Sequence, residues 1–519
     1  MNNAMLNTSD LLRATARAYP ERDMVVEGQR SFTYAQFDAM VDCFAGWFLR
    51  SGGARGFRAA YLFGNQWEVL LTYHAVGRAG GVVVSLNARL SPKEISFLLD
   101  EAAVEFVVYD PDFEALLTEA IGLCARSLET IAAGSVKGAA RHALENILAS
   151  TQRPAPLAFP HISANDDSGI WFTSGTTGRP KGAVVTHGSS VFSALLTSGV
   201  ACISSETRLV SVAPLFHRGA VEDVHLAVTM MGGVHFLTKR FEPKRTLELL
   251  ESTRATYAFI VPTMAQMMLE VPDHGSYDLS HLRCWMSASA PLREDLQERI
   301  RSEFRIPTDA LANAYGITES LMNTYCLGKD LLKRPRSAGR PVPLTEVRIL
   351  GPDHEFLRPG EIGEIVIAGP CQLRTYLGRQ EDYVNTILEA EGKRWYRSGD
   401  LGYLDQDGFL FIVDRSKDMI ITGGENVYSV EVEIALAGQP DVAEVAVIGE
   451  PDAKWGERVV AVIVPKHGRQ PTESDLLHAC NVIANYKRPK RFVFLDSLPR
   501  NSFGKLQKSA LRDIVKSIP

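Results

Sequence analysis

The chain has 519 residues and a net charge of -6 at pH 7; 45% of its residues are hydrophobic and 22% are charged. That length exceeds what one hydrophobic core can organise, so the sequence predicts about two to four packed units. The negative balance argues against a nucleic-acid partner, and it means that local groups must hold any anionic substrate. No run approaches the ~18 apolar residues of a membrane span, so no span is predicted.

The first 350 residues alternate between two hydrophobic patterns. The opening segment, 1–22, lacks the apolar stretch of a secretory signal and predicts an amphipathic helix after Thr8-Ser9-Asp10. Runs rich in β-branched residues then predict strands at 58–63, 81–86, 105–109 and 258–261. Helices are predicted between them at 67–79, 91–102, 243–253 and 292–304, the second from the capping box Ser91-Pro92-Lys93-Glu94. This alternation predicts parallel sheets with helices on both faces.

The pattern changes after about residue 340. Gly, Pro and Asp turns divide three short predicted strands, as in an antiparallel β-rich subdomain, at 346–350, 364–368 and 409–413. From about 415 a small α+β unit is predicted, with strands near 442–448, 458–464 and 491–495 and a helix at 473–484 capped by Thr472. The expected fold class is therefore α/β: a large N-terminal domain of parallel-sheet subdomains plus a β-rich subdomain, and a small α+β C-terminal domain.

The seven cysteines are odd in number, scattered and free of CxxC spacing. This usage is typical of a reducing compartment and argues against a zinc site, so a cytoplasmic location is expected. The sequence leaves the oligomeric state open, a homodimer included.

The most informative segment runs from Ile170 to Gly182 and reads IWFTSGTTGRPKG. An apolar run, interpreted as a strand, leads into a loop of glycines and hydroxyl residues that suits a polyphosphate, because glycines let successive backbone N–H groups point at an anion. It is not the ordinary phosphate loop, since Arg179-Pro180 separate Gly178 from Lys181. A flexible linker is the alternative interpretation. The candidate phosphate-binding residues are Thr173, Ser174, Gly175, Thr176, Thr177, Gly178 and Lys181.

This loop closely resembles the phosphate loop of the adenylate-forming superfamily, which includes the acyl-CoA synthetases, and the likeness extends from Ser31 to Lys505. The resemblance implies an ATP-dependent carboxylate–CoA ligase that forms an acyl-AMP intermediate and releases pyrophosphate. It implies ATP, Mg²⁺ and coenzyme A as cofactors and a small-molecule carboxylic acid as the partner. It also implies an adenylation domain over 1–413, whose β-rich subdomain covers about 340–413, and a mobile C-terminal domain over 414–519.

A second motif, Asn313-Ala314-Tyr315-Gly316-Ile317-Thr318-Glu319, is similar to the adenine and metal motif of that superfamily. By resemblance Tyr315 stacks on adenine, Thr318 acts catalytically at the α-phosphate, and Glu319 holds Mg²⁺, a hard cation that prefers carboxylate oxygen. The segment 287–291 stands where the family usually has a glycine-rich turn beside the adenine, and serine replaces glycine here. The implied nucleotide contacts are Asn313, Ala314, Tyr315, Gly316 and Thr318, together with Ser289, Ala290 and Pro291.

Tyr396-Arg397-Ser398-Gly399-Asp400 resembles the family segment whose aspartate binds both ribose hydroxyls. A carboxylate is a strong bidentate acceptor for a diol, although a simple turn aspartate is the alternative. By the same resemblance Asp414 is the hinge of the C-terminal domain and Arg415 contacts ribose and phosphate. Ile412 is assigned to the nucleotide site as well.

Gly423 and Gly424 match the glycine pair that lines the route of the coenzyme A thiol. Glycine leaves room for a narrow pantetheine arm, and a plain hairpin turn is the alternative. Lys505, at the end of Pro499-Arg500-Asn501-Ser502-Phe503-Gly504-Lys505, matches the terminal catalytic lysine of the family. An exposed lysine with no catalytic role is the alternative there.

The sequence says less about the acid. Pro214-Leu215-Phe216-His217 resembles the strand end that leads into the acyl pocket, which assigns His217 a catalytic place beside the carboxylate. Amino-acid-activating relatives carry an aspartate shortly after the phenylalanine of this region, and Phe216-His217-Arg218 stands here instead, which argues against an amino-acid substrate. Arg218 could pair either a polar substrate group or Glu222 one helical turn away. A fatty or aryl monocarboxylate is expected, with an acid that carries a second carboxylate or another polar group as the minor alternative. An enzyme that loads a carrier protein and a non-catalytic nucleotide-binding regulator are the rival functions.

Overall fold

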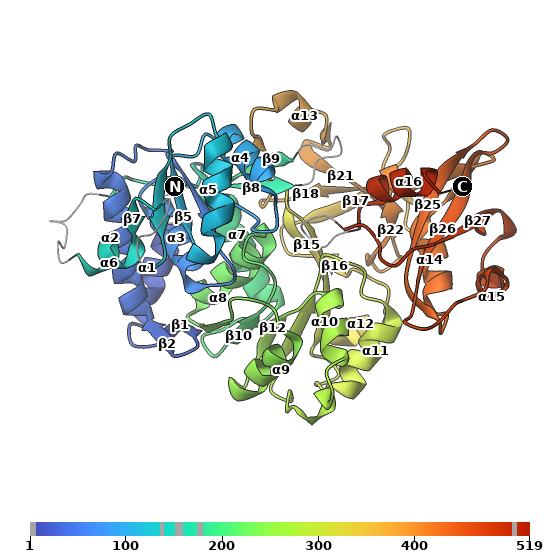
Figure 1. Cartoon of the computed structure of the whole chain (residues 1–519), viewed down its shortest axis with the longest axis horizontal. Helices are drawn as coiled ribbons and strands as arrows, with labels where there is room; N and C mark the ends of the chain where they lie inside the picture. Colours follow the sequence, from blue (N-terminus) through green and yellow to red (C-terminus); the bar gives the residue numbers. More distant parts are fainter. Residues whose placement is uncertain (1–6, 135–139, 151–158, 174–179, 501–505, 519) are drawn as a thin grey trace. The chain divides into compact units, whose positions relative to one another are not determined.

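The computed structural model describes residues 7–134, 140–150, 159–173, 180–500 and 506–518 (Figure 1). The chain divides into two compact units. The first unit comprises the chain up to Val347 together with Ile367–Tyr396, and the second comprises Arg348–Val366 together with Arg397–Pro519.

One mixed sheet of the first unit has the strand order β16-β15-β14-β13-β12-β10-β11-β1-β2. Its strands are β1 (Asp23–Glu27), β2 (Arg30–Thr33), β10 (Arg208–Ser211), β11 (Val234–Leu237), β12 (Tyr257–Phe259), β13 (Cys284–Ser287), β14 (Leu311–Ile317), β15 (Leu321–Cys326) and β16 (Arg340–Pro341). The strands from β1 through β14 along this order are parallel, whereas β2, β15 and β16 pair antiparallel at the edges. The carboxyl ends of β10, β12, β13 and β14 therefore share one edge.

The other sheet of the first unit has the order β19-β9-β8-β4-β3-β5-β6-β7. Its strands are β3 (Arg58–Leu62), β4 (Val82–Ser85), β5 (Phe106–Tyr109), β6 (Glu129–Ala132), β7 (His142–Ala143), β8 (Asp167–Thr173), β9 (Lys181–Thr186) and β19 (Thr375–Tyr376). Alternate residues of β3 enter two different cores: Ala59 and Tyr61 one, Ala60 and Leu62 the other. Both faces of β3 are thus buried, as the predicted parallel sheet requires.

The helices of the first unit cover these sheets. They are α1 (Thr8–Ala18), α2 (Tyr34–Arg50), α3 (Trp67–Arg78), α4 (Pro92–Glu101), α5 (Glu114–Leu123), α6 (Leu144–Ala149), α7 (His187–Val200), α8 (Leu226–Met231), α9 (Pro243–Ser252), α10 (Pro262–Leu269), α11 (Glu294–Glu303), α12 (Gly328–Lys333) and α13 (Gln380–Val384). A π-helix, Gly219–His225, precedes α8. Within the described ranges, none of the helices has the length and apolar character that crossing a membrane would need.

Two helix starts test the capping signals. The capping box of Ser91 and Glu94 is present, as predicted. The first helix, however, begins at Thr8 rather than after Asp10, because the Asn7 side chain accepts hydrogen bonds from the backbone of Ser9 and Asp10. Asparagine is as good an N-cap as serine or threonine, so the start moves toward the N-terminus.

The β-rich sheet contains β17 (Glu346–Leu350), β18 (Gly363–Ala368), β20 (Ile387–Ala390), β21 (Lys393–Leu404) and β22 (Leu410–Arg415), in the order β17-β18-β21-β20 with β22 beside β21. Both β20 and β22 pair antiparallel with β21, which agrees with the antiparallel β-rich subdomain expected from the sequence, although β20 and β21 are not among the predicted strands. The boundaries between the two compact units fall within β17, β18 and β21.

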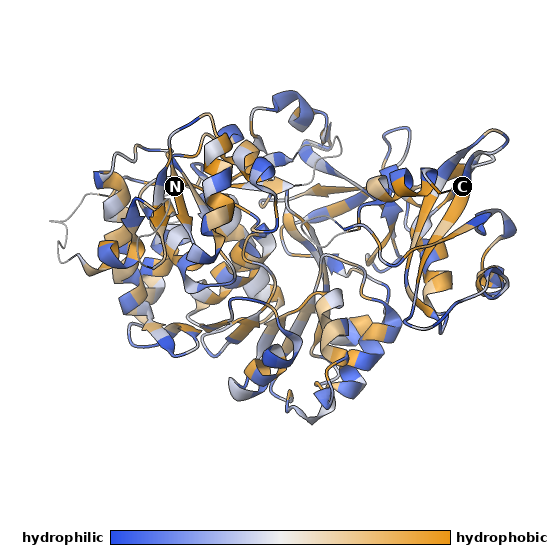
Figure 2. Ribbon diagram, in the orientation of Figure 1, coloured by the Kyte–Doolittle hydropathy of each residue, from blue (hydrophilic) through white to orange (hydrophobic). Residues whose placement is uncertain are grey.

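The C-terminal sheet of the second unit has the order β24-β23-β26-β25, with β27 beside β26. Its elements are β23 (Ile420–Thr422), β24 (Glu425–Val427), α14 (Ser429–Ala437), β25 (Val442–Asp452), β26 (Gly456–Pro465), α15 (Glu473–Ala479), β27 (Arg491–Phe494) and α16 (Lys508–Lys516). Alternate residues of β26 enter two cores, which α14 and α16 help to close, and Figure 2 shows the hydrophobic character of β25 and β26. The helix predicted at 473–484 ends at Ala479, and a 3₁₀ turn follows at Cys480–Val482, where Val482 is exposed.

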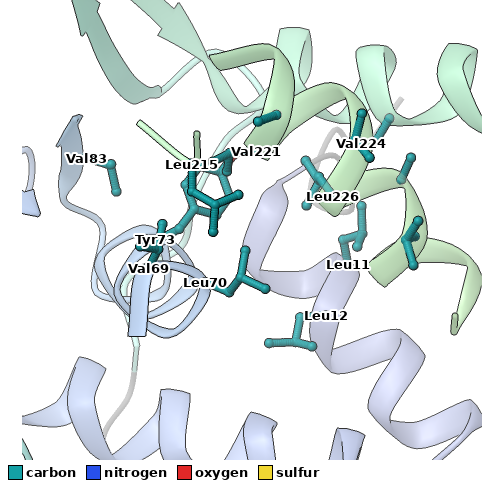
Figure 3. Close-up of a cluster of buried hydrophobic side chains, with 14 of the residues drawn as sticks. Leu11, Leu12, Val69, Leu70, Tyr73, Val83, Leu215, Val221, Val224 and Leu226 are labelled. Atoms are coloured by element: carbon teal, nitrogen blue, oxygen red, sulfur yellow. The ribbon is translucent and has the colours of Figure 1, made fainter. Parts of the chain in front are cut away.

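A buried apolar cluster supports the segment between β10 and α8. Figure 3 shows side chains from α1, α3 and this segment in that cluster, among them Leu11, Tyr73, Leu215 and Val221. Burial of such side chains stabilises each by roughly 1.5–3 kcal/mol. The segment that carries His217 and Arg218 is therefore packed against a buried core.

Candidate active site

The glycine-rich loop connects two antiparallel strands. Thr173 and Lys181 face each other in the pairing of β8 with β9, so the strand predicted before the loop is confirmed. Five of the assigned phosphate-binding residues lie outside the described residues: Ser174, Gly175, Thr176, Thr177 and Gly178. The Lys181 ammonium lies 3.0 Å from Asp382 Oδ2 and 5.3 Å from the centre of the Tyr376 ring.

Tyr376 connects this hairpin to the assigned metal carboxylate. The strand β19 pairs with β9, which puts Tyr376 opposite Ala183. Its hydroxyl donates to Glu319 Oε1 at 2.8 Å and lies 2.8 Å from the Tyr396 hydroxyl. Burial and the nearby charge of Glu319 raise the pKa of Tyr376 above its ordinary value, so the phenol stays a donor at neutral pH. Sequence reasoning missed Tyr376, since nothing local marks a two-residue strand.

Thr318 and Glu319 occupy the turn between β14 and β15. The backbones at this hairpin approach so closely that a Cβ on Gly316 would lie 2.4 Å from the Leu321 carbonyl oxygen. Only glycine fits there without a shift of backbone. The backbone N–H of Leu373 donates to the Glu319 carbonyl, at 2.6 Å.

The other assigned residues of this motif are mostly buried in β14. Ala314 and Tyr315 are less than a tenth exposed. The Asn313 side chain donates to the Ser337 carbonyl at 2.9 Å, an interaction that anchors the strand. The pairing of Ser287 with Asn313 puts the segment 288–291 at the adjoining strand end, so the two assigned adenine segments are neighbours.

Ser289 has a φ of +72°, a left-handed conformation that favours glycine. The turn therefore keeps the backbone that the family's glycine implies, although serine stands there. Strain of this kind is common at functional sites, and here it lies beside the assigned adenine segment. Ser289 and its neighbours Ala290 and Pro291 are exposed.

Three side chains hold the loop that follows β10, two of them from strands β3 and β4 and one from the loop after β3. The Tyr61 hydroxyl donates to the Leu215 carbonyl and the Ser85 hydroxyl to the Phe216 carbonyl, both at 2.7 Å. The Asn65 side chain bonds the backbone of Ala213 and Leu215. These contacts position His217, whose pKa is lowered to about 4 by desolvation and by the positive charge of Arg89. The imidazole is therefore neutral at physiological pH.

Arg218 pairs with Glu222 rather than with a substrate group. Its Nε donates to Glu222 Oε2 at 2.6 Å, and neither side chain is exposed. Of the two partners considered from the sequence, the structure identifies Glu222. The same guanidinium donates to the Thr318 carbonyl at 2.7 Å.

The second unit brings the assigned ribose residues together. Asp400 and Arg415 face each other across β21 and β22, with Arg415 Nε 3.1 Å from Asp400 Oδ1. Ile412 lies on the same strand as Arg415 and is exposed. Asp414 is buried and accepts from the Arg415 backbone N–H at 2.7 Å and from the Ser429 hydroxyl at 2.7 Å, at the start of α14. Its role as a hinge stays a prediction, as does the domain boundary there.

Gly423 and Gly424 form the two-residue turn between β23 and β24, both with positive φ. Two successive left-handed residues are typical of a tight hairpin turn. The plain hairpin turn considered from the sequence as the alternative therefore describes their backbone. The Gly423 N–H donates to the Trp455 carbonyl at 2.7 Å. Their assignment to coenzyme A stays a prediction. Lys505 lies outside the described residues.

The described carboxylates fit a magnesium ion that arrives with a nucleotide. Among the described residues, no group of three or more His, Cys, Asp or Glu side chains could hold a metal ion by itself. Glu319 supplies one carboxylate at a turn, oriented by Tyr376. Mg²⁺ usually binds through one or two carboxylates plus substrate phosphates and water, which matches this donor set.

Comparison with known proteins covers both units. A family model described as AMP-binding enzyme matches residues 12–377, and one described as AMP-binding enzyme C-terminal domain matches 431–505. The chain is 36% identical over 500 residues to feruloyl-CoA synthase of Amycolatopsis sp, covering 96% of each chain. It is 33% identical to indoleacetate–CoA ligase of Aromatoleum aromaticum, covering 96% of this chain and 95% of the relative. The crystal structure of ATP-bound MatB from Rhodopseudomonas palustris superimposes with a TM-score of 0.87 at 29% identity, covering 99% of both chains.

Proposed function

The chain belongs to the AMP-binding enzyme family and is an AMP-forming acid–thiol ligase, and we propose that it converts a fatty or aryl monocarboxylate into its coenzyme A thioester. ATP and Mg²⁺ serve the reaction, and coenzyme A is the co-substrate. The observation that carries the proposal is that the Tyr376 side chain contacts both Lys181 and Glu319. A phosphate-binding lysine and a metal-binding carboxylate must lie close together if both act on one triphosphate.

The first step is attack of the substrate carboxylate on the α-phosphorus of ATP. A bond forms from a carboxylate oxygen to phosphorus, the bond to the β-phosphate oxygen breaks, and pyrophosphate leaves with that electron pair. Two anions must approach, so the enzyme needs fixed positive charge and donors around the α-phosphate. We assign Lys181, Thr318 and Lys505 to that task. Magnesium held by Glu319 would neutralise phosphate charge.

In the second step the coenzyme A thiolate attacks the acyl carbon and AMP leaves. We assign Asp400 and Arg415 to the AMP ribose and Gly423 and Gly424 to the thiol route. A neutral His217 beside the acyl carbon donates or accepts one hydrogen bond without adding charge. The names of feruloyl-CoA synthase and indoleacetate–CoA ligase support an aryl acid, and that of a long-chain-fatty-acid–CoA ligase of Mycobacterium tuberculosis, at 33% identity, supports a fatty acid; the 36% identity to feruloyl-CoA synthase makes an aryl acid our first choice.

A pyrophosphate-release screen tests the proposal. The purified chain is incubated with ATP and Mg²⁺ over a panel of aryl and aliphatic acids, with and without coenzyme A. We expect acid-dependent pyrophosphate release, strongest with an aryl monocarboxylate, and a thioester only when coenzyme A is present. Release without any thioester would overturn the choice of acceptor, and no release with any acid would overturn the reaction.

A further inference from the structure

We infer that Arg218 is a positioning residue for the Thr318–Glu319 turn, and thereby for the bound Mg²⁺ and phosphates; this inference rests on the proposed function. Arg218 lies directly after the loop that carries His217, at the start of the π-helix. It is 2% exposed. A buried arginine needs several partners, because its five N–H groups lose water on folding.

The guanidinium contacts four segments of the first unit. Nε donates to Glu222, one terminal nitrogen donates to the Thr318 and Cys371 carbonyls at 2.7 and 3.5 Å, and the other donates to the Ser189 hydroxyl at 3.3 Å. One rigid planar group thus connects the π-helix, α7, the β14–β15 turn and the chain before β19.

Two of these contacts bear on the assigned metal carboxylate. Thr318 immediately precedes Glu319, so a hydrogen bond to its carbonyl restricts the peptide that carries the carboxylate. The Cys371 segment is the one whose Leu373 N–H donates to the Glu319 carbonyl. Arg218 therefore bonds the backbone on both sides of the hydrogen bond between Leu373 and Glu319. The Tyr376 hydroxyl bonds the Glu319 carboxylate itself. Such outer contacts typically change metal affinity or activity by about 10–100-fold when removed.

Glu222 has a different task. Its two oxygens accept from Arg218 and from the Tyr73 hydroxyl, the latter at 3.2 Å. It neutralises the buried charge, but no described contact joins its side chain to the turn. Removing one partner of a buried ion pair is costly, whereas replacing both with neutral groups can be tolerated. Stability and positioning can therefore be separated by mutation.

The test uses three variants of the full chain: Glu222→Gln, Arg218→Met/Glu222→Gln and Arg218→Lys. Glu222→Gln keeps the arginine and an acceptor for Tyr73, so it should lose stability yet retain the affinity for the metal–ATP complex. The double variant removes both buried charges and should recover stability, yet bind that complex about 10–100-fold more weakly. Lysine supplies a point charge that cannot reach every partner at once, so Arg218→Lys should fall between them.

Electron paramagnetic resonance of Mn²⁺ measures how tightly each variant binds Mn²⁺–ATP as ATP is added. Calorimetry in EDTA separately measures how tightly each variant binds metal-free ATP. We expect the double variant to lose affinity for ATP only when the metal is present. Its KM for the metal–ATP complex should rise and its KM for the acid should stay unchanged. If affinity follows thermal stability across the variants instead of following Arg218, the inference is wrong. Wild-type chain that binds Mn²⁺–ATP but releases no pyrophosphate would overturn the proposed function and leave this comparison intact.

Discussion

At the scale of single residues, the site depends on side chains whose neighbours in sequence reveal little about them. Tyr376 contacts the side chains of both Lys181 and Glu319. In the structure the Lys181 ammonium forms an ion pair with Asp382, 3.0 Å away. A triphosphate that binds Lys181 must therefore compete with an internal carboxylate, which lowers the affinity for any ligand of weaker charge.

Ser289 offers a test of backbone strain at this scale. Ser289→Gly should stabilise the first unit by about 0.5–1 kcal/mol, because relief of roughly 1–2 kcal/mol of left-handed strain outweighs the greater freedom of unfolded glycine. The measurement is the urea unfolding midpoint. Ala290→Gly is the matched control, since Ala290 lacks a positive φ and should lose about 0.5–1 kcal/mol. Equal effects at both positions would contradict the assignment of strain.

At the scale of elements, hairpin turns carry much of the assigned chemistry. The glycine-rich loop joins β8 to β9, the metal carboxylate lies on the β14–β15 turn, and the glycine pair joins β23 to β24. Antiparallel pairing holds both ends of the β14–β15 and β23–β24 turns, so their backbone groups are positioned without a dense local core. This arrangement suits polar ligands that approach backbone closely.

The β23–β24 turn can be tested directly. Gly424 has open space around its missing Cβ, whereas a Cβ on Gly423 would lie 3.0 Å from the Trp455 ring. Gly423→Ala should therefore destabilise the second unit more than Gly424→Ala, by urea unfolding. If the turn borders the thiol route, Gly424→Ala should slow thioester formation roughly ten- to hundred-fold while pyrophosphate release persists. Equal slowing of both half-reactions would contradict that role.

At the scale of the whole molecule, the proposed reaction divides its steps between two sets of residues. Lys505 is assigned to the first half-reaction and the Gly423–Gly424 turn to the second. Lys505→Ala should reduce adenylation by roughly 10²–10³ and spare thioester formation from supplied acyl-adenylate. Single-turnover assays of each half measure this, with Lys516→Ala, at an exposed lysine of the same segment, as the control. A matching loss in both halves would contradict the division.

Buried titratable groups predict how stability depends on pH. Burial lowers the pKa of histidines to about 3 for His74 and His225, to about 4 for His187 and His217, and well below the ordinary value for His235. Unfolding restores an ordinary pKa of about 6.5, so the unfolded chain binds more protons below that pH. Stability should therefore fall as the pH drops from about 6.5 toward 4, by up to about 1.4 kcal/mol per pH unit for each histidine.

Two buried carboxyl groups act in the opposite sense. Burial raises the pKa of Asp223 to about 7 and of Glu68 to about 8. The stability that each group contributes is therefore fully present below about pH 4 and is lost as the pH rises through 7 to 8. The five histidines outweigh these two groups between pH 4 and 6.5. Urea unfolding of the intact chain at pH 5, 6.5 and 8 should show a maximum near pH 6.5. Stability that stays flat from pH 5 to 6.5 would contradict the histidine account.

Much of this molecule is encoded locally and could be predicted from the sequence. The capping box at Ser91, the alternation of strands and helices, and the strand that precedes the glycine-rich segment depend on residues that are neighbours in the chain. Local hydrogen bonds and side-chain periodicity specify such features before any tertiary contact forms. The family resemblance rests on the same kind of contiguous segments.

The order of the strands and the environment of each polar group depend on tertiary contacts. Arg218 and Thr318, or Tyr376 and Glu319, meet only because sheets and loops bring distant segments together. Whether Arg218 faced a substrate or Glu222 was a question of burial, which a short segment does not determine. The physical reason is that burial and the cost of an unpaired charge depend on everything packed around a group, whereas turns and caps depend on a few adjacent residues.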